Sequence, residues 1–104
     1  MTVLNLSFAE IIDPELFERY VERAGALMKD RGIEVVSRGR YLKSVAGQDL
    51  NPAVGAVFRY PDMEAATSFF ASKAYLALIP LRDKACRMTI HLFDEATGTA
   101  HSDE

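Results

Sequence analysis

The chain has 104 residues, of which 49% are hydrophobic and 26% charged, and its formal net charge is −3. This length suits one compact domain, and the balance is that of an ordinary water-soluble protein. The net charge argues against nucleic acid or an anionic membrane as a partner, and no apolar run approaches the roughly 20 residues of a membrane span. The single cysteine, Cys86, has no internal disulfide partner, which fits a cytoplasmic location.

The first 32 residues predict a strand followed by an amphipathic helix. From Thr2 to Glu10 two kinds of side chain alternate, and a period of two is typical of a strand with two unlike faces. Asp13 and Pro14 then mark a helix start, with Asp13 as the cap and Pro14 in the first turn, where its missing N–H costs nothing. An apolar stripe at helical spacing follows, and Gly32 is a suitable terminator.

Two further strands are predicted in the middle of the chain, over residues 33–43 and 53–60. The segment 44–52 between them is longer than a hairpin loop, which usually has about 2–5 residues. It holds several turn-forming residues, so we expect a loop that is either mobile or functional.

The remaining chain predicts a broken helix and a last strand. Asp62 caps a helix that breaks at Ser72 and restarts there. Pro80 should bend or end this helix, because proline cannot donate to the helical hydrogen bonds. Residues 86–94 form the last strand, and the small and polar residues 96–104, His101 included, are expected to form a flexible tail.

The predicted order of elements is β-α-β-β-α-β, within a single domain of residues 1–95. Right-handed crossovers then give an α+β, ferredoxin-like fold, with a four-stranded antiparallel sheet and both helices on one face. RNA-recognition domains share this order but need aromatic residues on the exposed face of the third strand. Gly55 and Val57 occupy those positions, so we expect no nucleic acid as a partner.

The alternation of the outer strands also predicts two faces of the sheet. The helix side is expected to carry large apolar residues, namely Leu4, Leu6, Phe8, Met88, Ile90 and Leu92. The opposite side is expected to carry a mixed set, namely Val3, Asn5, Ser7, Ala9, Arg87, Thr89, His91 and Phe93. Such a mixed face suits burial against a second copy around a wet cavity, so we predict a homodimer with facing sheets. The alternative is a solvent-exposed face, which antiparallel sheets tolerate.

The segment from residue 58 to residue 82 carries the most specific motifs. They are, in order, Tyr60-Pro61-Asp62, Glu64-Ala65-Ala66, Phe69-Phe70, Ser72-Lys73-Ala74-Tyr75 and Arg82. Together with the first strand and helix, this pattern resembles the domain of unknown function 1330 (DUF1330) family of the dimeric α/β-barrel superfamily, over about residues 2–94. The resemblance implies a ferredoxin-like homodimer. The wider superfamily includes cofactor-independent monooxygenases, haem-degrading enzymes and isomerases.

Three residues are candidates for catalysis. A histidine in a cavity can serve as an acid or a base, and His91 is expected to share a face with Asn5 and Ser7, where it would move a proton. Arg40 and Arg59 lie on the central strands, where a forked guanidinium would hold a carboxylate or enolate oxygen. The alternatives are a hydrogen-bonded histidine at the dimer interface, and arginines that pair with acidic residues or point into solvent.

Four residues, Asn5, Ser7, Tyr60 and Arg82, are expected to bind a ligand. For Arg82 a structural hydrogen bond to a nearby carbonyl is equally open. Cys86 is expected in the core, on the side of the strand opposite to the candidate histidine, because their spacing of five is odd. Neither a metal site nor a cofactor is expected, since no Cys/His cluster has metal-ligand spacing.

The function expected is that of a small cytoplasmic homodimer that handles a small organic molecule. The resemblance to the family implies no known reaction; a cofactor-independent enzyme, similar to a monooxygenase or an isomerase, is expected by analogy with the wider superfamily. The alternatives are a non-enzymatic small-molecule-binding or accessory dimer module, and a structural partner subunit. The lining of the cavity separates the first two, because an enzyme needs its polar side chains to converge around a void.

Overall fold

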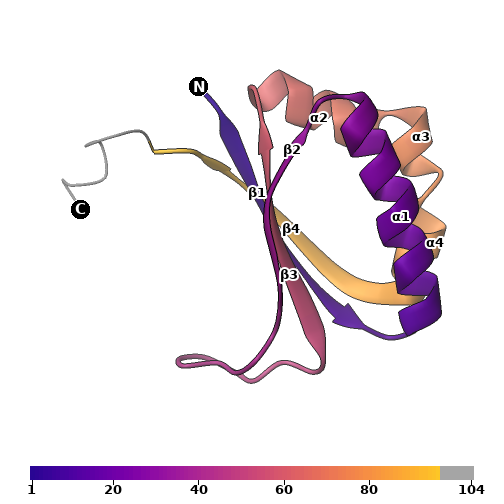
Figure 1. Cartoon of the computed structure of the whole chain (residues 1–104), viewed down its shortest axis with the longest axis vertical. Helices are drawn as coiled ribbons and strands as arrows, with labels where there is room; N and C mark the ends of the chain where they lie inside the picture. Colours follow the sequence, from indigo (N-terminus) through magenta and orange to yellow (C-terminus); the bar gives the residue numbers. More distant parts are fainter. Residues whose placement is uncertain (97–104) are drawn as a thin grey trace.

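A computed structural model of the chain describes residues 1–96 and shows an α+β fold (Figure 1). Its elements are, in chain order, β1 (Val3–Ile11), α1 (Pro14–Asp30), β2 (Glu34–Arg40), β3 (Ala53–Tyr60), α2 (Met63–Ala71), α3 (Lys73–Leu76), α4 (Ile79–Ala85) and β4 (Cys86–Asp94). The strands form an antiparallel sheet in the order β2-β3-β1-β4, and the helices cover one of its faces. The predicted ferredoxin-like fold is confirmed.

The described part of the chain ends where the predicted tail begins. Only Ala96 of that tail is described, and His101 lies outside the described residues. Within residues 1–96, none of the helices has both the length and the apolar character needed to cross a membrane.

The predicted helix caps form hydrogen bonds. Asp13 Oδ1 accepts the backbone N–H three residues further on at 3.1 Å, and Asp62 Oδ1 does the same at 2.8 Å. Ser72 Oγ accepts the N–H of Tyr75 at 3.2 Å, so α3 begins at the predicted break. A side-chain oxygen at these positions satisfies a backbone donor that has no partner within the helix.

Two boundaries differ from the prediction. The helix ends before Pro80 as expected, but a further helix, α4, then begins with Pro80 in its first turn. Proline suits that position because the N–H it lacks would have had no helical partner. Strand β2 ends at Arg40 rather than near residue 43, and a register shift between Val35 and Ser37 interrupts its pairing with β3.

The register between β1 and β4 decides which side chains face the helices. Ser7 pairs with Ile90 and Ala9 with Met88, and directly paired residues of an antiparallel sheet point to the same face. The β4 residues of these pairs are partly covered by the helices, as predicted. The helix-facing residues of β1 are therefore the buried ones, namely Val3, Asn5, Ser7 and Ala9.

The predicted faces of β1 are thus wrong, while those of β4 are right. Leu4, Leu6 and Phe8 point away from the helices, and Phe8 is about half exposed. The prediction assigned the larger apolar set to the core. The helix side of β1 instead borders a cavity, where small and polar side chains fit.

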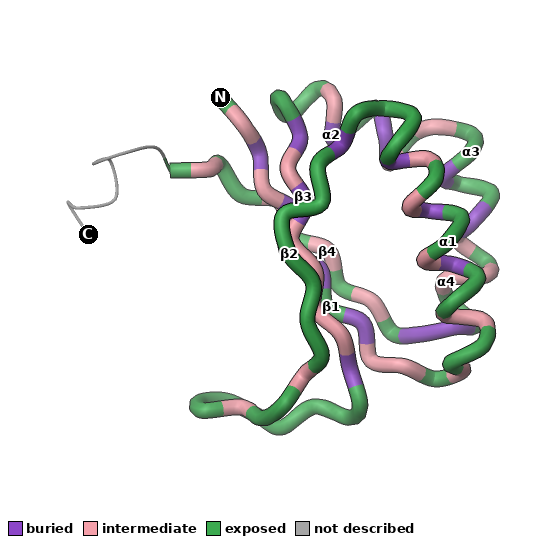
Figure 2. Tube along the Cα trace, in the orientation of Figure 1, coloured by how far each residue is buried: buried purple, intermediate pink, exposed green. Residues whose placement is uncertain are grey.

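The core lies between the sheet and the helices (Figure 2). Tyr60, Phe69 and Tyr75 are almost fully buried, and the ring centroids of Phe69 and Tyr75 are 5.2 Å apart. Strand β2, in contrast, is exposed along its whole length (Figure 2). The helix layer therefore leaves the β2 edge of the sheet uncovered.

Candidate functional site

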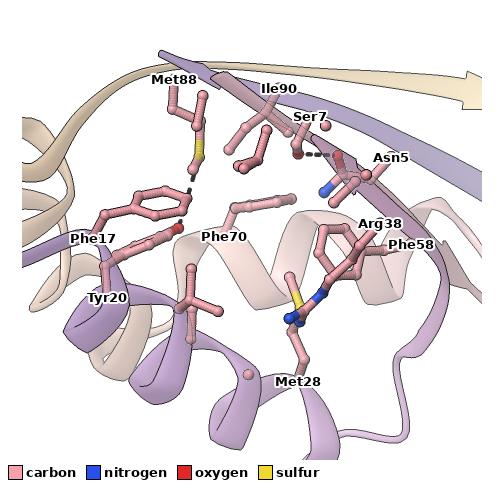
Figure 3. A pocket seen from close by; sticks show the side chains of 18 residues that line it. Asn5, Ser7, Phe17, Tyr20, Met28, Arg38, Phe58, Phe70, Met88 and Ile90 are labelled. Atoms are coloured by element: carbon pink, nitrogen blue, oxygen red, sulfur yellow. Dashed lines mark hydrogen bonds between the residues drawn. The ribbon is translucent and has the colours of Figure 1, made fainter. Parts of the chain in front are cut away.

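A cavity of about 310 Å³ lies between the helix face of the sheet and the helices. Most of its walls are apolar side chains from the strands, α1 and α2 (Figure 3). Small residues line it on both sides, with Ala24 and Gly25 from α1 and Ala9 and Ala56 from the sheet. A larger side chain at these positions would occupy the space. The volume lies at the lower end of the range for small-molecule pockets.

Asn5 and Ser7 form a buried polar pair in the cavity wall. Ser7 Oγ donates to Asn5 Oδ1 at 2.5 Å, and Asn5 Nδ2 donates to the Tyr60 hydroxyl at 3.0 Å. The amide nitrogen carries a second hydrogen and the serine hydroxyl retains lone pairs, so the pair can still donate to and accept from a ligand. Three of the predicted ligand-binding residues are thus brought together, with Tyr60 behind the wall and fully buried. Burial raises the pKa of Tyr60, against the opposing effect of the Asn5 hydrogen bond.

A second polar group, the Tyr20 hydroxyl, lies on the other side of the cavity (Figure 3). It is 2.9 Å from the Tyr75 hydroxyl, to which Arg82 Nη1 donates at 3.1 Å. The Tyr20 hydroxyl also donates to Met88 Sδ over a long 3.9 Å. Burial raises the pKa of Tyr20 well above its ordinary value. The predicted ligand residue Arg82 thus connects to the cavity through the hydroxyls of Tyr75 and Tyr20.

Arg38 lies at the β2 edge of the cavity and extends toward Met28 of α1 (Figure 3). Its side chain shares the helix face because it pairs with Ala56 of β3. Among the residues described, no carboxylate forms an ion pair with it. A guanidinium beside an apolar cavity is suited to an anionic oxygen of a ligand.

His91 does not belong to this site. It pairs with Leu6 and is exposed on the outer face of the sheet, whereas Asn5 and Ser7 lie on the helix face. The prediction that the three share a face is wrong, because a one-residue offset moves every side chain of a strand to the other side. Cys86 is buried on the helix side, opposite to His91 as its spacing predicted.

The two arginines predicted to be catalytic also lie outside the cavity. Arg59 is on the outer face, where Nη1 contacts Glu34 at 2.7 Å and Nε contacts Glu95 at 2.8 Å. It therefore pairs with acidic residues of its own chain. Arg40 is exposed at the end of β2. It lies beside a separate hollow of about 490 Å³, which is lined mainly by β2, β3 and the loop that connects these two strands.

The contacts of Arg59 predict a dependence of stability on acid pH. Hydrogen bonds from Arg59 and Thr2 lower the pKa of Glu95 from its ordinary 4.5 to about 2. Because the folded pKa lies below the unfolded one, this stabilisation is complete above about pH 4.5 and is lost as the pH falls toward about 2. The free energy of unfolding, measured in urea, should therefore fall less for Glu95→Gln than for the wild type as the pH decreases over that interval.

The matched control for this change is Asp94→Asn. Asp94 is exposed, and no ion pair involves it within residues 1–96. The free energy of unfolding of this variant should fall with pH as much as that of the wild type. An equally large fall in Glu95→Gln would contradict a role for the Arg59–Glu95 pair.

The sequence analysis missed the α1 side of the site. Tyr20 was not among the predicted ligand-binding residues, because a tyrosine beside apolar positions usually packs its ring, although its phenol could donate to a ligand. One signal was available, because Ala24-Gly25-Ala26 interrupts the large side chains of that stripe with small ones. A second was the presence of two polar residues within one strand face of an otherwise apolar segment.

Several solved structures share this fold. SnoaB, a cofactor-independent oxygenase from Streptomyces nogalater, is 13% identical with a TM-score of 0.70, over 96% of this chain and 98% of that one. RPA0582, a protein of unknown function from Rhodopseudomonas palustris, is 16% identical with a TM-score of 0.75, over 93% and 84%. A putative antibiotic biosynthesis monooxygenase from Caulobacter crescentus is 11% identical with a TM-score of 0.67, over 92% and 91%. At identities this low, the TM-scores show a common fold and nothing beyond it.

The family follows from the sequence match. The model of the family described as "Domain of unknown function (DUF1330)" matches residues 3–96, so the chain belongs to the DUF1330 family. The resemblance found in the motifs between residues 58 and 82 is thereby confirmed. A comparison with curated proteins finds no match.

Proposed function

We propose that the chain is a cytoplasmic, homodimeric protein that binds a small organic molecule in the cavity between its sheet and its helices. The observation that carries this proposal is the polar pair of Asn5 and Ser7 in an otherwise apolar wall. Buried polar groups are costly unless they find partners, and this pair keeps unused hydrogen-bonding capacity. A ligand with an apolar body and at least one polar oxygen would use it.

The homodimer is supported by the outer face of the sheet. Phe8 and Phe93 are 49% and 52% exposed there, and Leu4, Leu6 and Val57 lie on the same face. A contiguous apolar surface of this kind is typical of an interface, and a second copy in a two-fold dimer is the commonest partner. Since the cavity lies on the opposite face, each protomer would hold its own ligand.

An enzymatic function is the second candidate, as a cofactor-independent monooxygenase-like or isomerase-like reaction on the bound ligand. It is favoured by Arg38 at the cavity edge, where a cation would stabilise an enolate oxygen that forms during the reaction. The fold shared with SnoaB agrees with this candidate by analogy alone. In this version of the site, Arg38 and Asn5 take the place of His91, Arg40 and Arg59.

Filling the cavity by Gly25→Leu is expected to abolish ligand binding without unfolding the protein. A Cβ at Gly25 would meet no atom within 4 Å, and Gly25 lines the cavity. Replacing a glycine within a helix also stabilises it, by roughly 0.5–1 kcal/mol. A thermal-shift screen with metabolites should identify compounds that raise the melting temperature of the wild-type protein. The same compounds should leave the melting temperature of Gly25→Leu unchanged.

The control for the cavity-filling variant is Ala26→Leu, on the exposed face of the same helix. This variant should respond to the same compounds as the wild type. If Gly25→Leu also responded to them, the ligand would bind outside this cavity. Liquid chromatography with mass spectrometry of the hits after incubation in air separates the two candidates, because an isomer keeps the mass of its substrate but changes its retention time. A product with one added oxygen or a changed isomer favours the enzyme, and unaltered compounds favour the binding protein.

A further inference from the structure

We propose that Tyr20 recognises the ligand by donating its phenolic hydrogen bond to a carbonyl oxygen inside the cavity. This inference rests on the proposed binding function. It narrows the ligand to an apolar molecule that carries a ketone, an aldehyde or a conjugated carbonyl group.

The first step is the direction of the hydrogen bonds from Arg82 to Tyr20. A guanidinium only donates, so the Tyr75 oxygen is the acceptor of the 3.1 Å bond from Arg82. Tyr75 is 2% exposed, and within residues 1–96 its own hydrogen has one acceptor in reach, the Tyr20 oxygen at 2.9 Å. Because buried hydroxyl hydrogens are rarely left without a partner, Tyr75 donates to Tyr20.

The second step is the fate of the Tyr20 hydrogen. With its oxygen occupied by Tyr75, the hydroxyl can donate only toward Met88 Sδ, 3.9 Å away in the cavity wall. A thioether is a weak acceptor, and this distance is long. A buried donor is thus poorly satisfied at the cavity surface, and a carbonyl oxygen is a far better acceptor than the sulfur.

The third step is the strength of this donor. The positive charge of Arg82 polarises Tyr75, and Tyr75 polarises Tyr20, because hydrogen bonds in series strengthen one another in a medium of low dielectric constant. A phenol is protonated at neutral pH and burial raises the pKa of Tyr20 further, so its hydrogen is available to a ligand while its oxygen accepts from Tyr75. The rest of the cavity lining is mostly apolar, which favours a ligand that presents a single oxygen to this hydroxyl.

The test compares two ligands of nearly the same shape, 1-tetralone and tetralin, which differ by a carbonyl group. Their dissociation constants are measured by ligand-observed NMR for the wild type and for Tyr20→Phe. The wild type should bind the ketone about fivefold to tenfold more tightly than the hydrocarbon, the effect of one neutral hydrogen bond. Tyr20→Phe should lose this preference, while tetralin reports whether its cavity is intact.

Two more variants separate recognition from packing. Tyr75→Phe removes the donor behind Tyr20 and should reduce the preference for the ketone, as expected for a positioning residue. Met88→Leu removes only the weak sulfur acceptor and should keep or increase the preference. The hydrogen bond can also be measured in the wild-type protein alone, through the infrared stretching frequency of the bound ketone. A hydrogen bond from Tyr20 should lower this frequency below its value in an apolar solvent.

The outcomes distinguish this inference from the proposed function. If the wild type binds neither compound, the cavity is not a site for such molecules, and both proposals are overturned. If it binds both equally, if Tyr20→Phe keeps the preference, or if the carbonyl frequency is unshifted, the cavity binds ligands but the role of Tyr20 is overturned.

Discussion

Replacing Phe93 with aspartate is expected to dissociate the proposed homodimer. Phe93 pairs with Leu4 on the outer face of the sheet and is 52% exposed in the single chain. In a two-fold interface both copies bury the same surface, so two carboxylates would have to be taken out of water to enter it. Losing a central aromatic side chain of an interface costs about 2 kcal/mol or more, which raises the dissociation constant about 30-fold. Sedimentation velocity over a concentration series measures this change.

The matched control for the dimer is Leu76→Asp. Leu76 is 49% exposed, much like Phe93, but it lies on α3 in the helix layer. This variant should remain a dimer. A dimer that survives Phe93→Asp would place the interface elsewhere. Because the cavity lies on the opposite face of the sheet, the dissociated Phe93→Asp chain should still bind the ligands of the wild type.

The fold was predictable because its signals are local. Asp13, Asp62 and Ser72 each cap a helix through a bond to an N–H three residues away, so the pattern within one turn suffices to predict them. The order of elements then leaves few topologies, because connections are short and crossovers right-handed. The start of α4 at Pro80 was harder to predict, because proline both ends one helix and suits the first turn of the next.

The candidate site was less predictable because it depends on contacts between distant segments. The alternation within β1 does not show which of its two faces is buried against the helices. That follows from its register with β4, some 80 residues away in the chain. The sequence analysis used side-chain size and placed Asn5 toward a partner together with His91. The structure places Asn5 toward the helices, opposite Gly25 and Ala24, whose small size opens the cavity. The ligand site and the predicted dimer interface are consequently separate surfaces.

Replacing Asn5 with leucine is expected to destabilise the fold, although leucine is the more apolar residue. The buried Tyr60 hydroxyl would lose the N–H that donates to it, and the Ser7 hydroxyl would lose its acceptor. Leaving a buried polar group without a partner costs roughly 1–3 kcal/mol. The free energy of unfolding in urea should therefore fall by about that amount. Ligand shifts in the thermal screen should also disappear, because the amide hydrogen that Asn5 offers to the ligand is lost and leucine cannot replace it.

Tyr60→Phe completes a double-mutant cycle with Asn5→Leu. In the Asn5→Leu background it removes the hydroxyl that has lost its partner, so it should restore part of the lost stability. It should not restore ligand binding, since Tyr60 lies behind the cavity wall. A stable double variant that binds nothing would show that the polar pair is kept for the ligand. If Asn5→Leu were as stable as the wild type and bound the same compounds, the proposed site would be wrong.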